Sequence, residues 1–65
     1  MMRYGHYESM PAVWNDKCGW LLYDDEWREH HIAELVTKAG MISGAAFKRA
    51  YPDIPPIPAP ALAPC

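Results

Sequence analysis

The sequence predicts an α+β fold, in which a small β-hairpin packs on a two-helix corner and an extended proline-rich C-terminal arm follows. Three observations predict it. Short aromatic and apolar runs fill residues 1–23, helical patterns fill residues 25–51, and six of the seven prolines lie in residues 52–65. We therefore expect a compact mini-domain over residues 1–51 and a docking arm over residues 52–65.

Residues 1–23 carry the strand signals. Arg3 to Tyr7 is a short aromatic run that we expect to be extended. Two apolar runs, residues 12–14 and 18–23, flank the turn-prone tripeptide of residues 15–17. Apolar runs around such a turn are typical of a β-hairpin.

The second run of the hairpin is apolar on both faces. Trp20 and Leu22 share one face of an extended chain, and Leu21 and Tyr23 share the other. We expect one face to be covered by the protein's own helix and the other by something else.

Residues 25–39 show the clearest helical pattern. Three side chains recur every fourth residue: Trp27, His31 and Leu35. The aspartates at 24–25 can provide the N-cap, and Gly40 is a suitable C-terminal stop. Glu34 and Lys38 have the spacing of an i,i+4 ion pair.

A second helix is expected from Ser43, as N-cap, to about Tyr51, where Pro52 ends it. Only residues 40–42 separate the two helices, which predicts a tight helical corner.

The segment from Ala39 to Pro52 resembles the recognition segment of TetR-type regulators. That resemblance implies a helix-turn-helix in which Lys48 and Arg49 face DNA. The net charge of −2 argues against nucleic acid as a partner, so we favour a structural corner and keep a DNA-binding protein as an alternative.

The arm alternates proline with isoleucine, alanine and leucine and carries one charge, at Asp53. A solvated linker would contain more polar residues, so we expect the arm to dock in a groove of another protein. Residues 49–55 also fit the R-x-x-P-x-x-P pattern that SH3 domains bind. Cys65 is a candidate for an interchain disulfide; the alternative is that Cys18 and Cys65 are both free thiols.

The sequence lacks the residue patterns of an enzyme. Ser9 lies in no nucleophile motif, Ser43 is explained as a cap, and no glycine-rich phosphate loop is present. No pair of its histidines and cysteines has zinc-site spacing, and we expect His31 to pack under Trp27 while His30 is solvated. We therefore expect no catalysis, no metal and no cofactor.

Aromatic side chains exceed what so short a chain can bury, which favours a partner interface. The predicted partner-binding residues are Trp14, Trp20, Tyr23, Ile54, Pro55, Pro56, Ile57, Pro58 and Leu62.

We expect a minor structural subunit of a larger assembly, in particular a small bacteriophage virion component such as a capsid cement, linker, neck or tail protein. Its partners would be other protein subunits, in a repeated lattice or a homo-oligomer. It would be made in the host cytoplasm and located in the virion, or otherwise be cytoplasmic. No apolar stretch is long enough for a membrane span. The alternative is a small regulator that inhibits a host protein.

Overall fold

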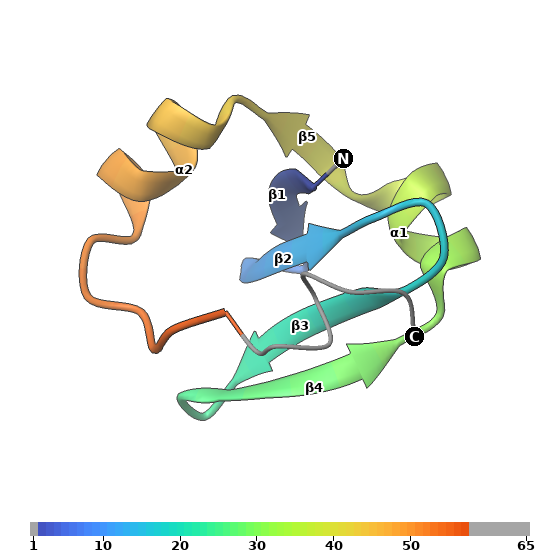
Figure 1. The fold of residues 1–65 in the computed structure, drawn as a ribbon, viewed down its shortest axis with the longest axis horizontal. Helices are drawn as coiled ribbons and strands as arrows, with labels where there is room; N and C mark the ends of the chain where they lie inside the picture. Colours follow the sequence, from blue (N-terminus) through green and yellow to red (C-terminus); the bar gives the residue numbers. More distant parts are fainter. Residues whose placement is uncertain (1, 58–65) are drawn as a thin grey trace.

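The computed structural model describes residues 2–57, which form an antiparallel sheet and two short helices (Figure 1). The elements are β1 (Arg3–Tyr7), β2 (Met10–Trp14), β3 (Gly19–Tyr23), β4 (Glu26–His30), α1 (Ile32–Lys38), β5 (Gly40–Ile42) and α2 (Gly44–Ala50). The predicted α+β class is confirmed.

The sheet has the strand order β4-β3-β2-β1-β5, with every neighbouring pair antiparallel. Strands β1 to β4 follow one another as a meander, and after α1 the chain returns to pair β5 with β1. In this register Tyr4 lies opposite both Val13 and Ile42. The predicted strand from Arg3 to Tyr7 and the hairpin around residues 15–17 are confirmed.

The prediction of one helix over residues 25–39 is wrong in its first part. Asp24 and Asp25 have φ values of 51° and 60°, and they form the two-residue turn that joins β3 to β4. Positive φ at both central residues matches the twist of a hairpin. The turn lays residues 26–30 along β3, where they supply backbone partners, and α1 begins only at Ile32.

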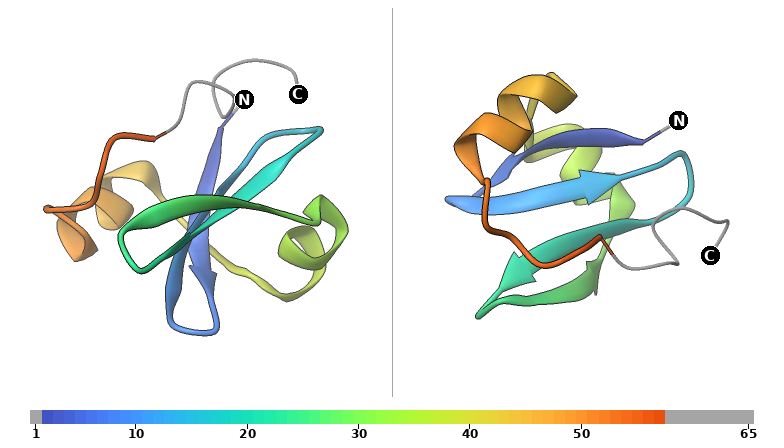
Figure 2. Two further views of the ribbon diagram at one scale, coloured as in Figure 1. Left: turned by 90° about the horizontal axis from the view of Figure 1, so that it is seen from below. Right: turned by 60° about the vertical axis from the view of Figure 1, so that its left-hand side comes forward.

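Gly40 to Ile42 do not form the predicted turn between the helices. They form β5, because pairing with β1 supplies partners for their backbone groups. In Figures 1 and 2, α1 and α2 lie well apart on different sides of the sheet. The cap of the second helix is as predicted, since the Ser43 hydroxyl accepts a hydrogen bond of 3.1 Å from the Ala46 N–H.

A core cluster of buried side chains lies on each face of the sheet. The cluster under α2 contains Val13, Cys18, Trp20 and Phe47. The cluster under α1 contains Ala12, Trp14, Leu21 and Leu35. Strand β3 is therefore covered on both faces, as its apolar sequence predicted, and both covers belong to the same chain.

Residues 52–57, which we call the strap, leave α2 and pass over the α2-side cluster (Figure 2). Ile54 and Ile57 pack against this cluster. Trp27 Nε1 donates a hydrogen bond of 3.1 Å to the carbonyl oxygen of Pro55. The strap thus covers the protein's own core. Neither helix in the described part of the chain has the length and apolar character needed to cross a bilayer.

Candidate protein-docking site

An apolar groove lies between α1, β5 and the turn that joins β2 to β3. Its cavity measures about 420 Å³ and is lined by Arg3, Trp14, Asn15, Asp16, Ile32, Val36, Ala39 and Met41. Val36 and Met41 are each 66% exposed, which is exceptional for large hydrophobic side chains among the described residues. We call this feature the α1–β5 groove.

The position of α1 follows from one close approach to the sheet. A Cβ atom built on Gly19 would lie 2.1 Å from Leu35 Cδ1, so any larger residue at position 19 would force the Leu35 side chain to shift. Leu35 is fully buried, and Val36 is turned about 100° from it around the helix axis. Val36 therefore faces away from the core, toward solvent.

Met41 owes its exposure to the alternation of side chains along β5. Ile42 belongs to the face under α2 and packs against that cluster. Met41 belongs to the opposite face and projects into the α1–β5 groove.

One end of the groove has a polar rim. Arg3 Nη1 lies 2.8 Å from Asp16 Oδ1, and this hydrogen bond, together with the arginine charge, lowers the pKa of Asp16. An apolar centre with a polar rim is the usual anatomy of a protein–protein interface.

A second groove lies on the other face of β5. Its cavity measures about 440 Å³ and is lined by Met2, Arg3, Tyr4, Met41, Ile42, Ser43 and Gly44. We call it the α2–β5 groove. The outer edge of β5 therefore lies between two mainly apolar hollows, and Met41 borders both of them.

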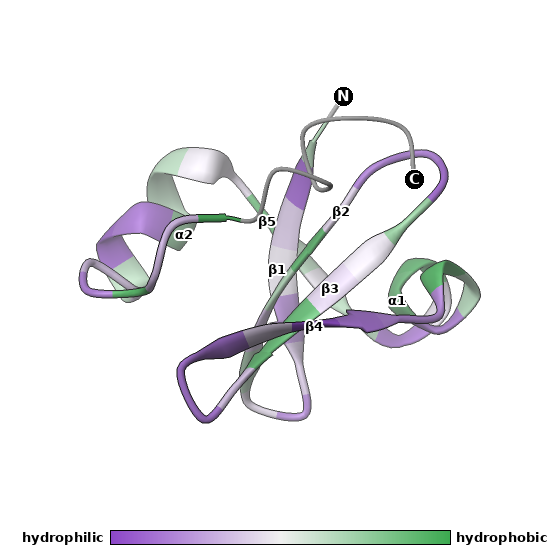
Figure 3. Cartoon of the chain, turned by 60° about the horizontal axis from the view of Figure 1, so that its bottom comes forward, coloured by the Kyte–Doolittle hydropathy of each residue, from purple (hydrophilic) through white to green (hydrophobic). Residues whose placement is uncertain are grey.

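The two edge strands of the sheet differ in chemistry. Strand β4 carries Glu26, Arg28 and Glu29 and is hydrophilic over most of its length (Figure 3). Strand β5 carries no charged residue. Charges on an edge strand discourage pairing with another chain, so only β4 has this protection.

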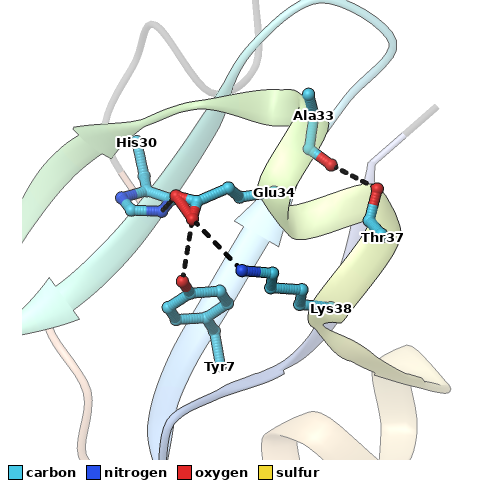
Figure 4. A network of polar contacts seen from close by, with 6 residues as sticks. All are labelled: Tyr7, His30, Ala33, Glu34, Thr37 and Lys38. Carbon is cyan, nitrogen blue, oxygen red and sulfur yellow. Dashed lines mark hydrogen bonds and ion pairs between the residues drawn. The ribbon is translucent and has the colours of Figure 1, made fainter.

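A polar network ties α1 to β1 and β4 (Figure 4). The Tyr7 hydroxyl donates to Glu34 Oε2 at 3.2 Å, and His30 Nε2 lies 3.1 Å from Glu34 Oε1. Lys38 Nζ lies 3.9 Å from Glu34 Oε2, which confirms the predicted i,i+4 pair. His30 is partly buried and His31 is exposed, so the expected positions of the two histidines are wrong.

The network shifts two pKa values. The hydrogen bond from Tyr7, followed by the charges of His30 and Lys38, lowers the pKa of Glu34. Desolvation, followed by the bond to Glu34, raises the pKa of Tyr7. These contacts join β1, β4 and α1, and the raised pKa of Tyr7 disfavours its ionised, nucleophilic form; we interpret them as structural.

The aromatic residues assigned to a partner do not form one exposed face. Trp14 and Trp20 are 3% and 5% exposed and belong to the two core clusters. Trp14 contributes only part of the lining of the α1–β5 groove. Tyr23 is 54% exposed, with the Arg28 guanidinium carbon 5.7 Å from its ring centre.

The arm residues assigned to a partner divide into two groups. Ile54, Pro55 and Ile57 are half-buried on the protein's own body, and Pro56 is exposed. Pro58, Leu62 and Cys65 lie outside the described residues.

Cys18, expected to be a free thiol, is 4% exposed and is not free, so this expectation is wrong. Within residues 2–57, no group of three His, Cys, Asp or Glu side chains could hold a metal ion.

Sequence reasoning missed Val36 and Met41. Neither residue was among the predicted partner-binding residues, and residues 40–42 were expected to form a turn between the helices. The available signal was weak, because Ile42 alone in the uncharged Gly40–Ile42 tripeptide is of a residue type that strands favour. Comparison of the chain with family models, with curated proteins and with solved structures found no match.

Proposed function

We propose that this chain is a non-enzymatic interaction subunit that docks onto other protein through the α1–β5 groove. The observation that carries the proposal is the pair of side chains Val36 and Met41, each 66% exposed beside that groove. Exposed methionine and aliphatic side chains grouped within a polar rim are favoured at protein interfaces.

The lining of the groove favours protein over a reacting small molecule. Among the described residues that line it, only Arg3 and Asp16 are charged, and they form an ion pair with each other. Within residues 2–57, the lining contains no serine, cysteine or lysine side chain that could act as an activated nucleophile. Apolar side chains of a partner would fill the centre, and its polar groups would meet the rim.

The narrower form of the proposal is a minor structural component of a larger assembly, in particular a bacteriophage virion component. A chain of 65 residues with an uncharged edge strand and an open groove suits a subunit held by its neighbours. A virion component would be present in many symmetric copies, whereas a regulator would be present at one copy per target.

Incorporation of variants into the native assembly tests the proposal. Val36→Glu should reduce incorporation at least about tenfold, because a buried unpaired carboxylate opposes association. Lys48→Glu is the matched control, since Lys48 is equally a surface position but lies on α2, outside the groove. Both variants should keep the circular dichroism spectrum of the unaltered protein. Normal incorporation of the folded Val36→Glu variant would refute the proposal.

A further inference from the structure

We infer that two copies of this chain associate through the outer edges of their β5 strands, antiparallel and about a twofold axis at Met41. The inference rests on the proposed function, for which it names the partner, a second copy. The two five-stranded sheets would become one sheet that is continuous across the axis.

The outer edge of β5 is suited to such pairing. The inner edge is occupied by β1, through residues 4–6, and within residues 2–57 no strand lies on the outer edge. The strand contains neither charge nor proline, the two features that most often prevent edge pairing. An unpaired edge offers N–H and C=O groups to an incoming strand.

The three residues of β5 are complementary to themselves under this symmetry. A twofold axis at Met41 places Gly40 of one copy opposite Ile42 of the other. A Cβ atom built on Gly40 would find nothing within 4 Å, so there is open space above it. Ile42 lies on the same face of the sheet and is half-buried, so its side chain can fill the space above Gly40 of the second copy.

The opposite face of the sheet is complementary as well. The two Met41 side chains would meet across the axis, where directly opposed Cβ atoms lie about 5 Å apart. Each Met41 would then reach toward the α1–β5 groove of the other copy, whose cavity of about 420 Å³ has room for it. Association would thus cover the exposed surface of Met41 and part of that of Val36.

The charges near the axis do not oppose this arrangement. Arg3 is paired with Asp16, and Lys38 is paired with Glu34. Each cation therefore approaches the second copy together with its own counter-charge. Because each copy contributes only a three-residue strand, we expect a weak and reversible dimer, with an area below that of a standard interface.

Dilution of the full-length protein tests the inference. Sedimentation velocity and ¹⁵N NMR spectra would be recorded from about 1 mM down to about 10 μM, a range that covers weak association. We expect a shift from dimer to monomer, with amide shift changes concentrated at residues 40–42. A mixture of labelled and unlabelled protein should give an intermolecular contact between the two copies of Met41.

Two substitutions in β5 test the pairing, one by adding charge and one by adding bulk. Met41→Glu would place two carboxylates opposite each other, and Gly40→Val would fill the space that accepts Ile42. Each should weaken association at least about tenfold. Tyr23→Glu is the control, since Tyr23 is also an exposed apolar side chain but ends β3, away from β5. Circular dichroism identifies any variant that fails to fold; the Cβ atom of Gly40→Val would contact no described residue within 4 Å.

The outcomes separate this inference from the proposed function. A protein that stays monomeric at about 1 mM, or a dimer that both β5 variants leave unchanged, overturns the inference. If the protein is monomeric but Val36→Glu still blocks incorporation into the native assembly, the groove binds a different protein and only the inference fails. If neither β5 nor Val36 variants change either measurement, both fail.

Discussion

The indole nitrogen of Trp27 and the carbonyl oxygen of Pro55 are joined by a hydrogen bond of 3.1 Å, which ties β4 to the strap. The two residues are far apart in the sequence, and they come from a segment predicted to be a helix and from an arm predicted to dock on another protein. The bond holds residue 55, which belongs to the predicted docking arm, against the folded body.

The first prediction concerns this bond. Trp27→Phe keeps an aromatic ring on β4 but removes the donor, leaving the Pro55 carbonyl without its partner. We expect a loss of about 1–2 kcal/mol in the free energy of unfolding, measured in urea. Tyr23→Phe is the control and should change stability by less than about 0.5 kcal/mol, because Tyr23 is exposed. Equal effects of both variants would show that the bond does not stabilise the fold.

The second prediction concerns a contact that ties the C-terminal end of α2 to β1. The Tyr51 hydroxyl and His6 Nδ1 share a hydrogen bond, and their rings meet edge to face with centres 5.4 Å apart. Tyr51→Phe should lower the free energy of unfolding by about 1 kcal/mol. Tyr4→Phe, which keeps the ring that packs on Phe47, should cost less. Unchanged stability in Tyr51→Phe would contradict a stabilising bond.

The third prediction is a dependence of stability on pH. The pKa of Glu34 is lowered in the folded state, mainly by the hydrogen bond from Tyr7. A lowered carboxyl pKa contributes stability that is present above the ordinary value of 4.5 and is lost as the pH falls through the folded value. The urea midpoint should therefore fall in the acid range below 4.5.

The pKa of Tyr7 moves the other way and limits stability at high pH. Because this pKa is raised, the contribution of Tyr7 to stability is present below pH 10.0 and is lost as the pH rises through the folded value.

Glu34→Gln should flatten the acid part of the profile, whereas Glu29→Gln, at an exposed position on β4, should leave it unchanged. Identical acid profiles for Glu34→Gln and the unaltered protein would contradict this account.

The hairpin, the first strand and the second helix could be predicted from sequence because their signals are local. Asn15 marks the turn between β2 and β3, and its side-chain oxygen accepts hydrogen bonds of 2.7 Å from the N–H groups of Lys17 and Cys18. Ser43 similarly carries its cap in its own side chain. These hydrogen bonds join residues two or three positions apart, so the sequence alone indicates them.

Strand β5 could not be predicted because its pairing with β1 is non-local, and β4 was missed because its local signals fit a helix as well as a hairpin. Asp24 and Asp25 are good N-cap residues as well as tolerable turn residues, and the periodicity from Trp27 to Leu35 completed the helical pattern by coincidence. Residues 26–30 form a strand rather than the predicted helix because they pair with the edge of β3. The docking site could not be predicted for the same reason. Met41 belongs to β5, and the pairing of β5 with β1 joins residues that are far apart in the sequence.

The last prediction tests the approach of α1 to the sheet. Gly19→Ala would place its Cβ 2.1 Å from Leu35 Cδ1 and 3.3 Å from Trp14 Cβ, so the fully buried Leu35 side chain must shift. We expect a loss of about 1–3 kcal/mol, the usual cost of overpacking. Gly40→Ala is the matched control, because open space surrounds its new Cβ and stability should hold. If both variants unfold at the same urea concentration as the unaltered protein, Gly19 does not set the depth of α1.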